Sequence, residues 1–201
     1  MIKLYNHPLS GNCYKVRLLL NHLGLKYERI DVDIFKGEQS KPELVMLNPN
    51  KKIPVIVDGD FVMWESNAIL LYLGKKFSPN PFYSESPEIF GVISQWLFFG
   101  KTTIDPTLAR ARYMVRFVPE ESCIEKDLIS LQEAGKSALQ ILNAHLKDNE
   151  FLAGSYSIAD MGCYPYVSTA EEGGISLSQF PAVQNWCNRI STRPGYVSME
   201  E

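Results

Sequence analysis

Hydrophobic positions in the first third of the chain alternate between strand-like and helix-like spacing. Residues 2–5 and 27–33 predict short strands. Between them, residues 12–24 repeat apolar side chains at helical spacing, with Gly24 placed to end that helix. Because a crossover helix joins the two strands, we expect them to be parallel.

The next residues predict a short helix, a hairpin and a second long helix. Residues 41–49 form the short helix, and residues 53–64 form two β-rich runs around the strong turn pair Asp58-Gly59. Residues 65–77 are amphipathic, with a helix start near Ser66. The order βαβ, α, ββα predicts a small α/β domain over residues 1–77.

Strand patterns stop after a segment rich in proline and serine, which predicts a linker over residues 78–86. Four helical patterns follow it, two long and two short, at 89–102, 124–146, 157–167 and 180–191. We therefore expect an all-helical second domain over residues 87–201.

Composition and charge are those of an ordinary globular protein. Of 201 residues, 45% are hydrophobic and 21% charged, and 20 Lys and Arg against 23 Asp and Glu give a formal net charge of -3. Nucleic acids and anionic membrane surfaces attract a positive field, so neither is expected as the main partner.

The cysteines and the amino terminus indicate a cytoplasmic protein with reduced thiols. The residues from Met1 onward enter a strand pattern directly, without the features of a secretory signal, and no apolar run is long enough to span a bilayer. Cys13, Cys123, Cys163 and Cys187 are far apart and show neither a C-x-x-C motif nor metal-ligand spacing, so no metal site is predicted.

Three short motifs are candidates for chemistry, and the first lies at the start of the helix predicted over residues 12–24. Ser10 and Cys13 have the spacing of a redox C-x-x-C motif, but a serine replaces the leading cysteine. Ser10 or Asn12 is expected to cap the helix, and the same N–H groups could instead stabilise a thiolate. No histidine is placed to make Ser10 a nucleophile, and Cys13 is expected to be a buried structural thiol.

The second motif surrounds Pro54, at the first position of a predicted strand. Proline there could hold Ile53 extended, so that a peptide could pair with its backbone, or it could only begin the strand. Lys51 and Lys52 just before it could meet a carboxylate or could simply be solvated.

The third motif contains Glu65 and Ser66. Ser66 is an expected N-cap, but Ile69 stands three residues later, so no capping box closes it. The helix N–H groups could therefore bind an anion, with Glu65 beside them for a cation, or the cap could be an ordinary one. A fourth pattern, Ser157 to Asp160, resembles a capping box and is predicted to be structural.

The order of these motifs resembles the glutathione S-transferase family, as a bacterial serine- or asparagine-type member. The resemblance covers nearly the whole chain, including residues 151–167 (FLAGSYSIADMGCYPYV) and 180–196 (FPAVQNWCNRISTRPGY). It implies a thioredoxin-like first domain that binds glutathione as co-substrate, an all-helical second domain, and a homodimer.

The resemblance also implies roles for particular residues. Ile53, before a cis Pro54, would pair with the cysteinyl backbone of glutathione, and Glu65 and Ser66 would hold its γ-glutamyl end. Lys51 or Lys52, with Gln39, would hold the glycyl carboxylate. Ser10 and Asn12 would stabilise the thiolate, whereas Cys13 matches no nucleophile of the family.

The second substrate would be a small hydrophobic electrophile or a peroxide. From the packing expected of the family, its pocket would be lined by Leu9, Phe35, Phe99 and Thr103. One alternative is a glutathione-dependent peroxidase or disulfide reductase, which Asn12 beside Ser10 favours. Another is a non-catalytic interaction protein. Such a protein would not need to keep Ser10, Pro54, Glu65 and Ser66 together, so their presence speaks against it.

Overall fold

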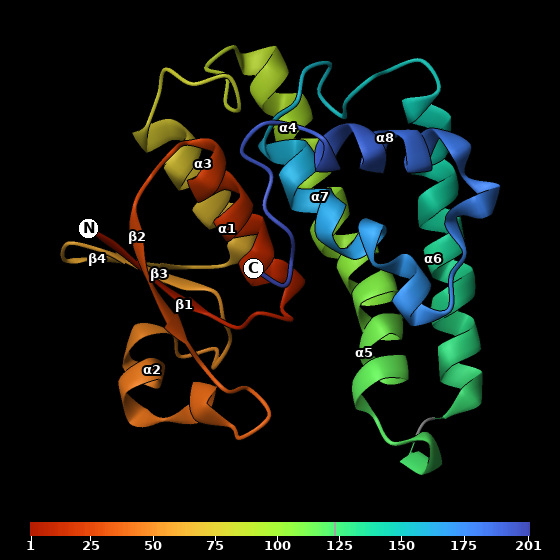
Figure 1. Cartoon of the computed structure of the whole chain (residues 1–201), viewed down its shortest axis with the longest axis horizontal. Helices are drawn as coiled ribbons and strands as arrows, with labels where there is room; N and C mark the ends of the chain where they lie inside the picture. The colour runs from red at the N-terminus through yellow and green to blue at the C-terminus, as the bar shows by residue number, and fades with distance from the viewer. Residues whose placement is uncertain (123) are drawn as a thin grey trace. The chain divides into compact units, whose positions relative to one another are not determined.

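The computed structural model describes residues 1–122 and 124–201, and Cys123 lies outside the described residues. Two compact units form: residues 1–83 together with 193–201, and residues 84–192 (Figure 1). The first unit is α/β and the second is helical, which confirms the predicted fold class. Residues 193–201, which the sequence places at the end of the helical domain, fold with the first unit.

The first unit is built on a four-stranded mixed sheet. Its strands are β1 (Ile2–Asn6), β2 (Tyr27–Asp31), β3 (Val55–Asp58) and β4 (Phe61–Trp64), in the order β2-β1-β3-β4. β1 and β2 are parallel, as their crossover helix requires, and β1 and β4 are each antiparallel to β3. β3 and β4 form the predicted hairpin, but Asp58 still pairs with Phe61, so the two-residue connection is Gly59-Asp60 and not Asp58-Gly59.

Helices cover both faces of this sheet. They are α1 (Gly11–His22), α2 (Pro42–Leu47) and α3 (Ser66–Lys76), with a short 3₁₀ helix, η1 (Glu38–Ser40), before α2. α1 and α3 pack against each other on one face, and α2 lies on the other (Figure 1). The apolar positions that predicted α1, such as Val16 and Leu19, are fully buried and form the core with Leu4 and Ile56.

The second unit consists of helices joined by short turns. These are α4 (Pro87–Phe99), η2 (Gly100–Ala109), α5 (Arg110–Phe117), η3 (Glu120–Ser122), α6 (Glu125–Leu146), α7 (Ile158–Ser168), η4 (Ala170–Gly173), η5 (Leu177–Gln179) and α8 (Pro181–Ser191). η2 is a π-helix that contains Pro106. Proline has no N–H to donate and its ring obstructs the preceding turn, which accounts for the wider winding there.

A buried carboxylate holds the start of α7. Asp160 accepts hydrogen bonds from the backbone N–H groups of Leu152 (2.9 Å) and Ser157 (2.9 Å) and from Trp186 Nε1 (2.8 Å). Ser157 caps α7 with its own side chain, which confirms the predicted capping box. Burial raises the pKa of Asp160 to about 6, although these donors favour the ionised form.

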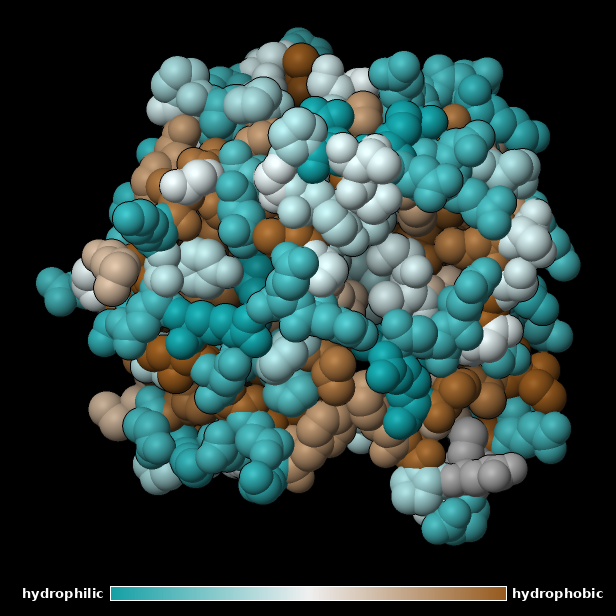
Figure 2. Space-filling view, in the orientation of Figure 1, coloured by the Kyte–Doolittle hydropathy of each residue, from teal (hydrophilic) through white to brown (hydrophobic). Residues whose placement is uncertain are grey.

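The surface is mixed in character. Figure 2 shows mainly hydrophilic side chains on the viewed face, with hydrophobic ones in separate groups. Across the two described ranges, no helix is long and apolar enough to pass through a membrane.

We predict that Asp160→Ala lowers the free energy of unfolding by about 3 kcal/mol or more, because it leaves three buried N–H donors without an acceptor. Denaturant-induced unfolding measures the change. Asp148→Ala removes an exposed carboxylate from the end of α6 and should shift stability by less than about 0.5 kcal/mol. Equal effects of the two substitutions would contradict the structural role of Asp160.

Candidate functional site

The register of the sheet brings the three predicted motifs to one edge. Tyr5, near the end of β1, pairs with Val55, the first residue of β3, and Val55 also pairs with Trp64, the last residue of β4. The segment after β1 leads to Ser10, Pro54 precedes β3, and Glu65 follows β4. Residues more than fifty positions apart therefore meet at this edge.

Ser10 caps α1, as predicted. Its backbone is extended (φ -82°, ψ 113°), its Oγ accepts a hydrogen bond from the backbone N–H of Cys13 (3.3 Å), and its own N–H donates to the carbonyl of His7 (3.1 Å). A hydroxyl that accepts through its oxygen can still donate its hydrogen to another group. Ser10 can thus cap the helix and donate to a ligand at once.

Asn12 and Ser66 form a hydrogen bond that joins the starts of α1 and α3. Ser66 Oγ donates to Asn12 Oδ1 at 3.0 Å, and Ser66 is only 3% exposed. With Oδ1 occupied, the amide Nδ2 of Asn12 is directed away from Ser66, and it has no partner in the part of the chain that the structure describes. The arrangement leaves Nδ2 as a fixed donor beside Ser10.

The predicted capping role of Ser66 is wrong. The N-cap of α3 is Glu65, and no side chain caps this helix start; Ser66 is the first helical residue. The hydroxyl of Ser66 is instead used by Asn12, which comes from a distant part of the sequence. A local capping pattern cannot reveal such a partner.

Two residues of the predicted site have strained backbones. Lys51 (φ 55°) and Glu65 (φ 73°) are the only non-glycine residues with positive φ among residues 1–122 and 124–201. Such conformations cost about 1–3 kcal/mol each and concentrate where a ligand is held. Both residues were predicted to contact glutathione.

The Ile53–Pro54 bond is cis, as the family resemblance implies. The loop before it is held by Asn48, which is 3% exposed: its Nδ2 donates to the Lys52 carbonyl (2.7 Å) and its Oδ1 accepts from the Asn50 N–H (2.9 Å). From the sequence, Asn48 was predicted only to end a helix. No local pattern marks a buried asparagine that supports a loop.

The residues predicted to hold the glycyl carboxylate and the second substrate lie in several elements. Lys51 and Lys52 are exposed, and Gln39 lies in η1 with its Oε1 shielded from solvent and without a hydrogen-bond partner among the described residues. Leu9 and Phe35 belong to the first unit and Phe99 and Thr103 to the second, so the pocket predicted from these four residues stays a prediction.

Cys13 is a buried thiol, as predicted. It is fully buried, and burial raises its pKa to about 11, although hydrogen bonds with Ser10 and the His7 carbonyl lower it. The thiol is therefore protonated near neutral pH and is neither a nucleophile nor a metal ligand in that state.

His7 is a buried residue of the site that the sequence did not identify. Its Nδ1 accepts a hydrogen bond from the Leu9 N–H (3.2 Å), and burial lowers its pKa against the opposing effects of Asp33 and Asp31. His7 is thus a neutral residue that accepts a hydrogen bond within the loop before Ser10. It belongs to no motif in the sequence, so its role could not be predicted.

Comparisons with known proteins agree with this geometry. Two family models match: "Glutathione S-transferase, N-terminal domain" over residues 1–75 and "Glutathione S-transferase, C-terminal domain" over residues 109–194. The chain is 35% identical to the disulfide-bond oxidoreductase YfcG of Escherichia coli K12, over 96% of this chain and 92% of that protein.

Solved structures are similar over nearly their full length. A glutathione S-transferase from Pseudomonas fluorescens superposes with a TM-score of 0.94 at 37% identity, covering 100% of this chain and 99% of that one. The transferase URE2P6 of Phanerochaete chrysosporium, solved with oxidized glutathione, gives a TM-score of 0.90 at 30% identity, covering 96% and 92%.

We predict that Cys13 resists alkylation in the folded protein near neutral pH. With a pKa of about 11, about one thiol in ten thousand is ionised at pH 7, and burial also blocks the reagent. Mass spectrometry of the peptide that contains Cys13, after iodoacetamide treatment, measures the modification. The same reaction in denaturant is the control, and equal rates in the two conditions would contradict the burial.

Proposed function

The chain belongs to the glutathione S-transferase family, and we propose that Ser10 and Asn12 activate glutathione for attack on small apolar electrophiles. The chain is a glutathione transferase, with glutathione as its co-substrate. The observation that carries the proposal is the Ser66–Asn12 hydrogen bond (3.0 Å), which fixes the Asn12 amide next to the capping serine.

The proposed chemistry depends on stabilising a thiolate. A free thiol has a pKa of about 8.5, and each unit by which a site lowers it corresponds to about 1.4 kcal/mol. The Ser10 hydroxyl, the Asn12 Nδ2 and the positive end of α1 together favour the charged sulfur. The thiolate then attacks an electrophilic carbon of the second substrate and forms a thioether, either by addition, after which the substrate takes up a proton, or by substitution, in which the leaving group departs with the bond electrons.

The rest of glutathione would lie along the edge of the sheet. Ile53 would pair with its cysteinyl backbone, Glu65 and Ser66 would hold the γ-glutamyl end, and Lys51 or Lys52 with Gln39 the glycyl carboxylate. The strained backbones of Lys51 and Glu65 support this placement. Leu9, Phe35, Phe99 and Thr103 would contact the electrophile.

A second candidate function is reduction of disulfides or peroxides by glutathione. In a disulfide exchange, the glutathione thiolate forms a bond to one sulfur and the other leaves as a thiolate; a second glutathione then releases the product and oxidised glutathione forms. Cys13 is buried and cannot reach a disulfide, so the attacking thiols in both steps come from glutathione. The similarity of the chain to a disulfide-bond oxidoreductase supports this second candidate function.

We also propose that the protein is a homodimer, and its cytoplasmic location stays a prediction. α4 exposes a group of large apolar side chains: Ile89, Phe90, Val92 and Phe98. Exposed apolar groups of this kind commonly mark protein interfaces. A second copy of the chain is the partner that the family resemblance implies.

Substitution at the helix start tests the activation step. Ser10→Ala and Asn12→Ala should each lower the rate of glutathione conjugation about ten-fold or more, since each removes a donor to the thiolate. Cys13→Ala is the matched control in the same helix turn and should keep activity. Conjugation and hydroperoxide and disulfide reduction assays should be run for all four proteins.

The outcomes separate the candidates. Loss of activity in Cys13→Ala alone would overturn the proposal. Failure of the wild type to bind immobilised glutathione would instead favour a non-catalytic interaction protein. Rapid disulfide reduction with slow conjugation would favour the second candidate.

Phe98 tests the homodimer, because it is 69% exposed on α4. We expect the wild type to sediment as a dimer, and Phe98→Asp to weaken association by placing a charge in an apolar interface. Analytical ultracentrifugation measures both. Phe61→Asp alters an exposed apolar residue of the first unit and serves as a comparison; a monomeric wild type would refute the dimer.

A further inference from the structure

Segment 193–201 folds back onto the first unit through a tight turn. Arg193 to Tyr196 form a turn closed by a hydrogen bond from the Tyr196 N–H to the Arg193 carbonyl (3.1 Å), with Pro194 and Gly195 (φ 81°) at its centre. This is the residue order of a type II turn. A Cβ on Gly195 would lie 3.0 Å from His22 Nδ1, so the glycine permits close approach to the end of α1.

Side chains of the first unit hold the backbone of this segment at alternate residues. Tyr14 Oη donates to the Val197 carbonyl (2.6 Å), and Arg17 Nη2 donates to the Met199 carbonyl (2.6 Å). Arg29 donates to a main-chain oxygen of Glu201. Because all three contacts are made with main-chain oxygens, they depend little on the side chains of the segment.

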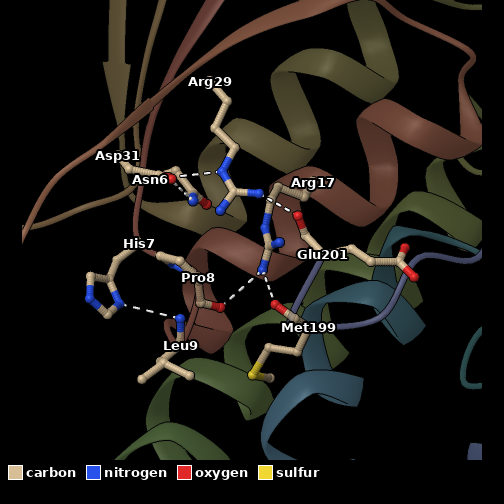
Figure 3. A network of polar contacts seen from close by, with 9 residues as sticks. All are labelled: Asn6, His7, Pro8, Leu9, Arg17, Arg29, Asp31, Met199 and Glu201. Carbon is tan, nitrogen blue, oxygen red and sulfur yellow. Dashed lines mark hydrogen bonds and ion pairs between the residues drawn. The ribbon is translucent and has the colours of Figure 1, made fainter.

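The same arginines contact the loop that leads to the active site. Arg17 Nη2 also donates to the Pro8 carbonyl at 3.1 Å, two residues before Ser10 (Figure 3). Arg29 Nε donates to Asp31 Oδ1 (2.8 Å), which also accepts from Asn6 Nδ2 (2.6 Å). Segment 193–201 is thus connected at two places to residues 6–8.

Folding stability alone does not explain an arginine at position 17. Arg17 is 1% exposed, and its Nε and Nη1 are buried without hydrogen-bond partners among the residues described. Burial lowers its pKa, and the nearby Arg29 adds to this effect. Replacing such a cation with an apolar side chain removes its desolvation cost, which offsets part of the loss of its hydrogen bonds to Pro8 and Met199.

We propose that Arg17 is a positioning residue: with segment 193–201 it fixes the Pro8 carbonyl, and so the loop that presents Ser10 to the glutathione thiol. The Met199 carbonyl orients the guanidinium, and the guanidinium in turn holds Pro8. Small displacements of a donor from the reacting atom can lower a rate greatly. The inference rests on the proposed thiolate role of Ser10.

The test uses Arg17→Met, a chain that ends at Tyr196, and the two changes combined. The thiol pKa of bound glutathione is measured from the pH dependence of the ultraviolet thiolate absorbance, together with kcat, KM for glutathione and the melting temperature. Arg17→Met should lower kcat about ten-fold and raise the thiol pKa by about one unit. Its KM should stay within about two-fold, since the groups that bind glutathione remain.

Stability and coupling separate positioning from a general structural effect. Arg17→Met should lower the melting temperature only slightly, because the removed desolvation cost offsets much of the two lost hydrogen bonds, while activity falls about ten-fold. The shortened chain should lose activity in the same direction, and the combined variant should lose less than the sum of the two effects, because both changes remove the hydrogen bond between Arg17 and Met199. Glu200→Gln, an exposed residue of the same segment, should match the wild type.

Several results would overturn the inference. One is a folded Arg17→Met or shortened chain with wild-type kcat and thiol pKa; another is fully additive effects in the combined variant. If Arg17→Met fails to fold, the kcat and the thiol pKa of the shortened chain alone test the inference. Ser10→Ala in the same titration distinguishes the two proposals: if it leaves the thiol pKa unchanged, the proposed role of Ser10 fails, whereas an effect of Ser10→Ala without one of Arg17→Met refutes only this inference.

Discussion

The pairing of β1 with β3 is the constraint on which the site depends. Leu4 faces Ile56 across this pair, and both side chains are fully buried, so a shift by one residue would turn core side chains toward the opposite face. With this register fixed, the end of β1, the start of β3 and the end of β4 share one edge. The three motifs proposed to bind glutathione meet at that edge as a result.

Helix packing then sets the finer geometry. α1 and α3 pack together on one face of the sheet, which brings their first turns close enough for Ser66 to donate to Asn12 at 3.0 Å. Ser10, which satisfies the start of α1, is therefore also one of the residues proposed to meet the ligand. Capping and binding are two uses of the same unpaired N–H groups, as the chemistry of helix termini permits.

Much of the fold could be predicted from the sequence because its determinants are local. The hairpin of β3 and β4, the cap at Ser10, the start of α3 at Ser66 and the capping box at Ser157 each depend on residues a few positions apart. The partner of the Ser66 hydroxyl and the contacts of segment 193–201 could not be predicted in this way. The partners of Ser66 and Arg17 lie 54 and 182 residues away, and tertiary packing alone brings them together.

Cys13 shows why the thiol to be activated belongs to a ligand and not to the chain. It lies in the first turn of α1, near the hydrogen-bonding groups and the positive helix end that favour a thiolate, yet burial raises its pKa to about 11. Full desolvation of a charge outweighs a helix end and two hydrogen bonds, since a helix end contributes only about 1 kcal/mol. A sulfur can gain from the same groups only where it keeps contact with solvent, and Ser10 and Asn12, half-buried at the helix start, are placed on that side. The serine in place of the first cysteine of a C-x-x-C motif is therefore consistent with a protein that supplies donors and takes its thiol from glutathione.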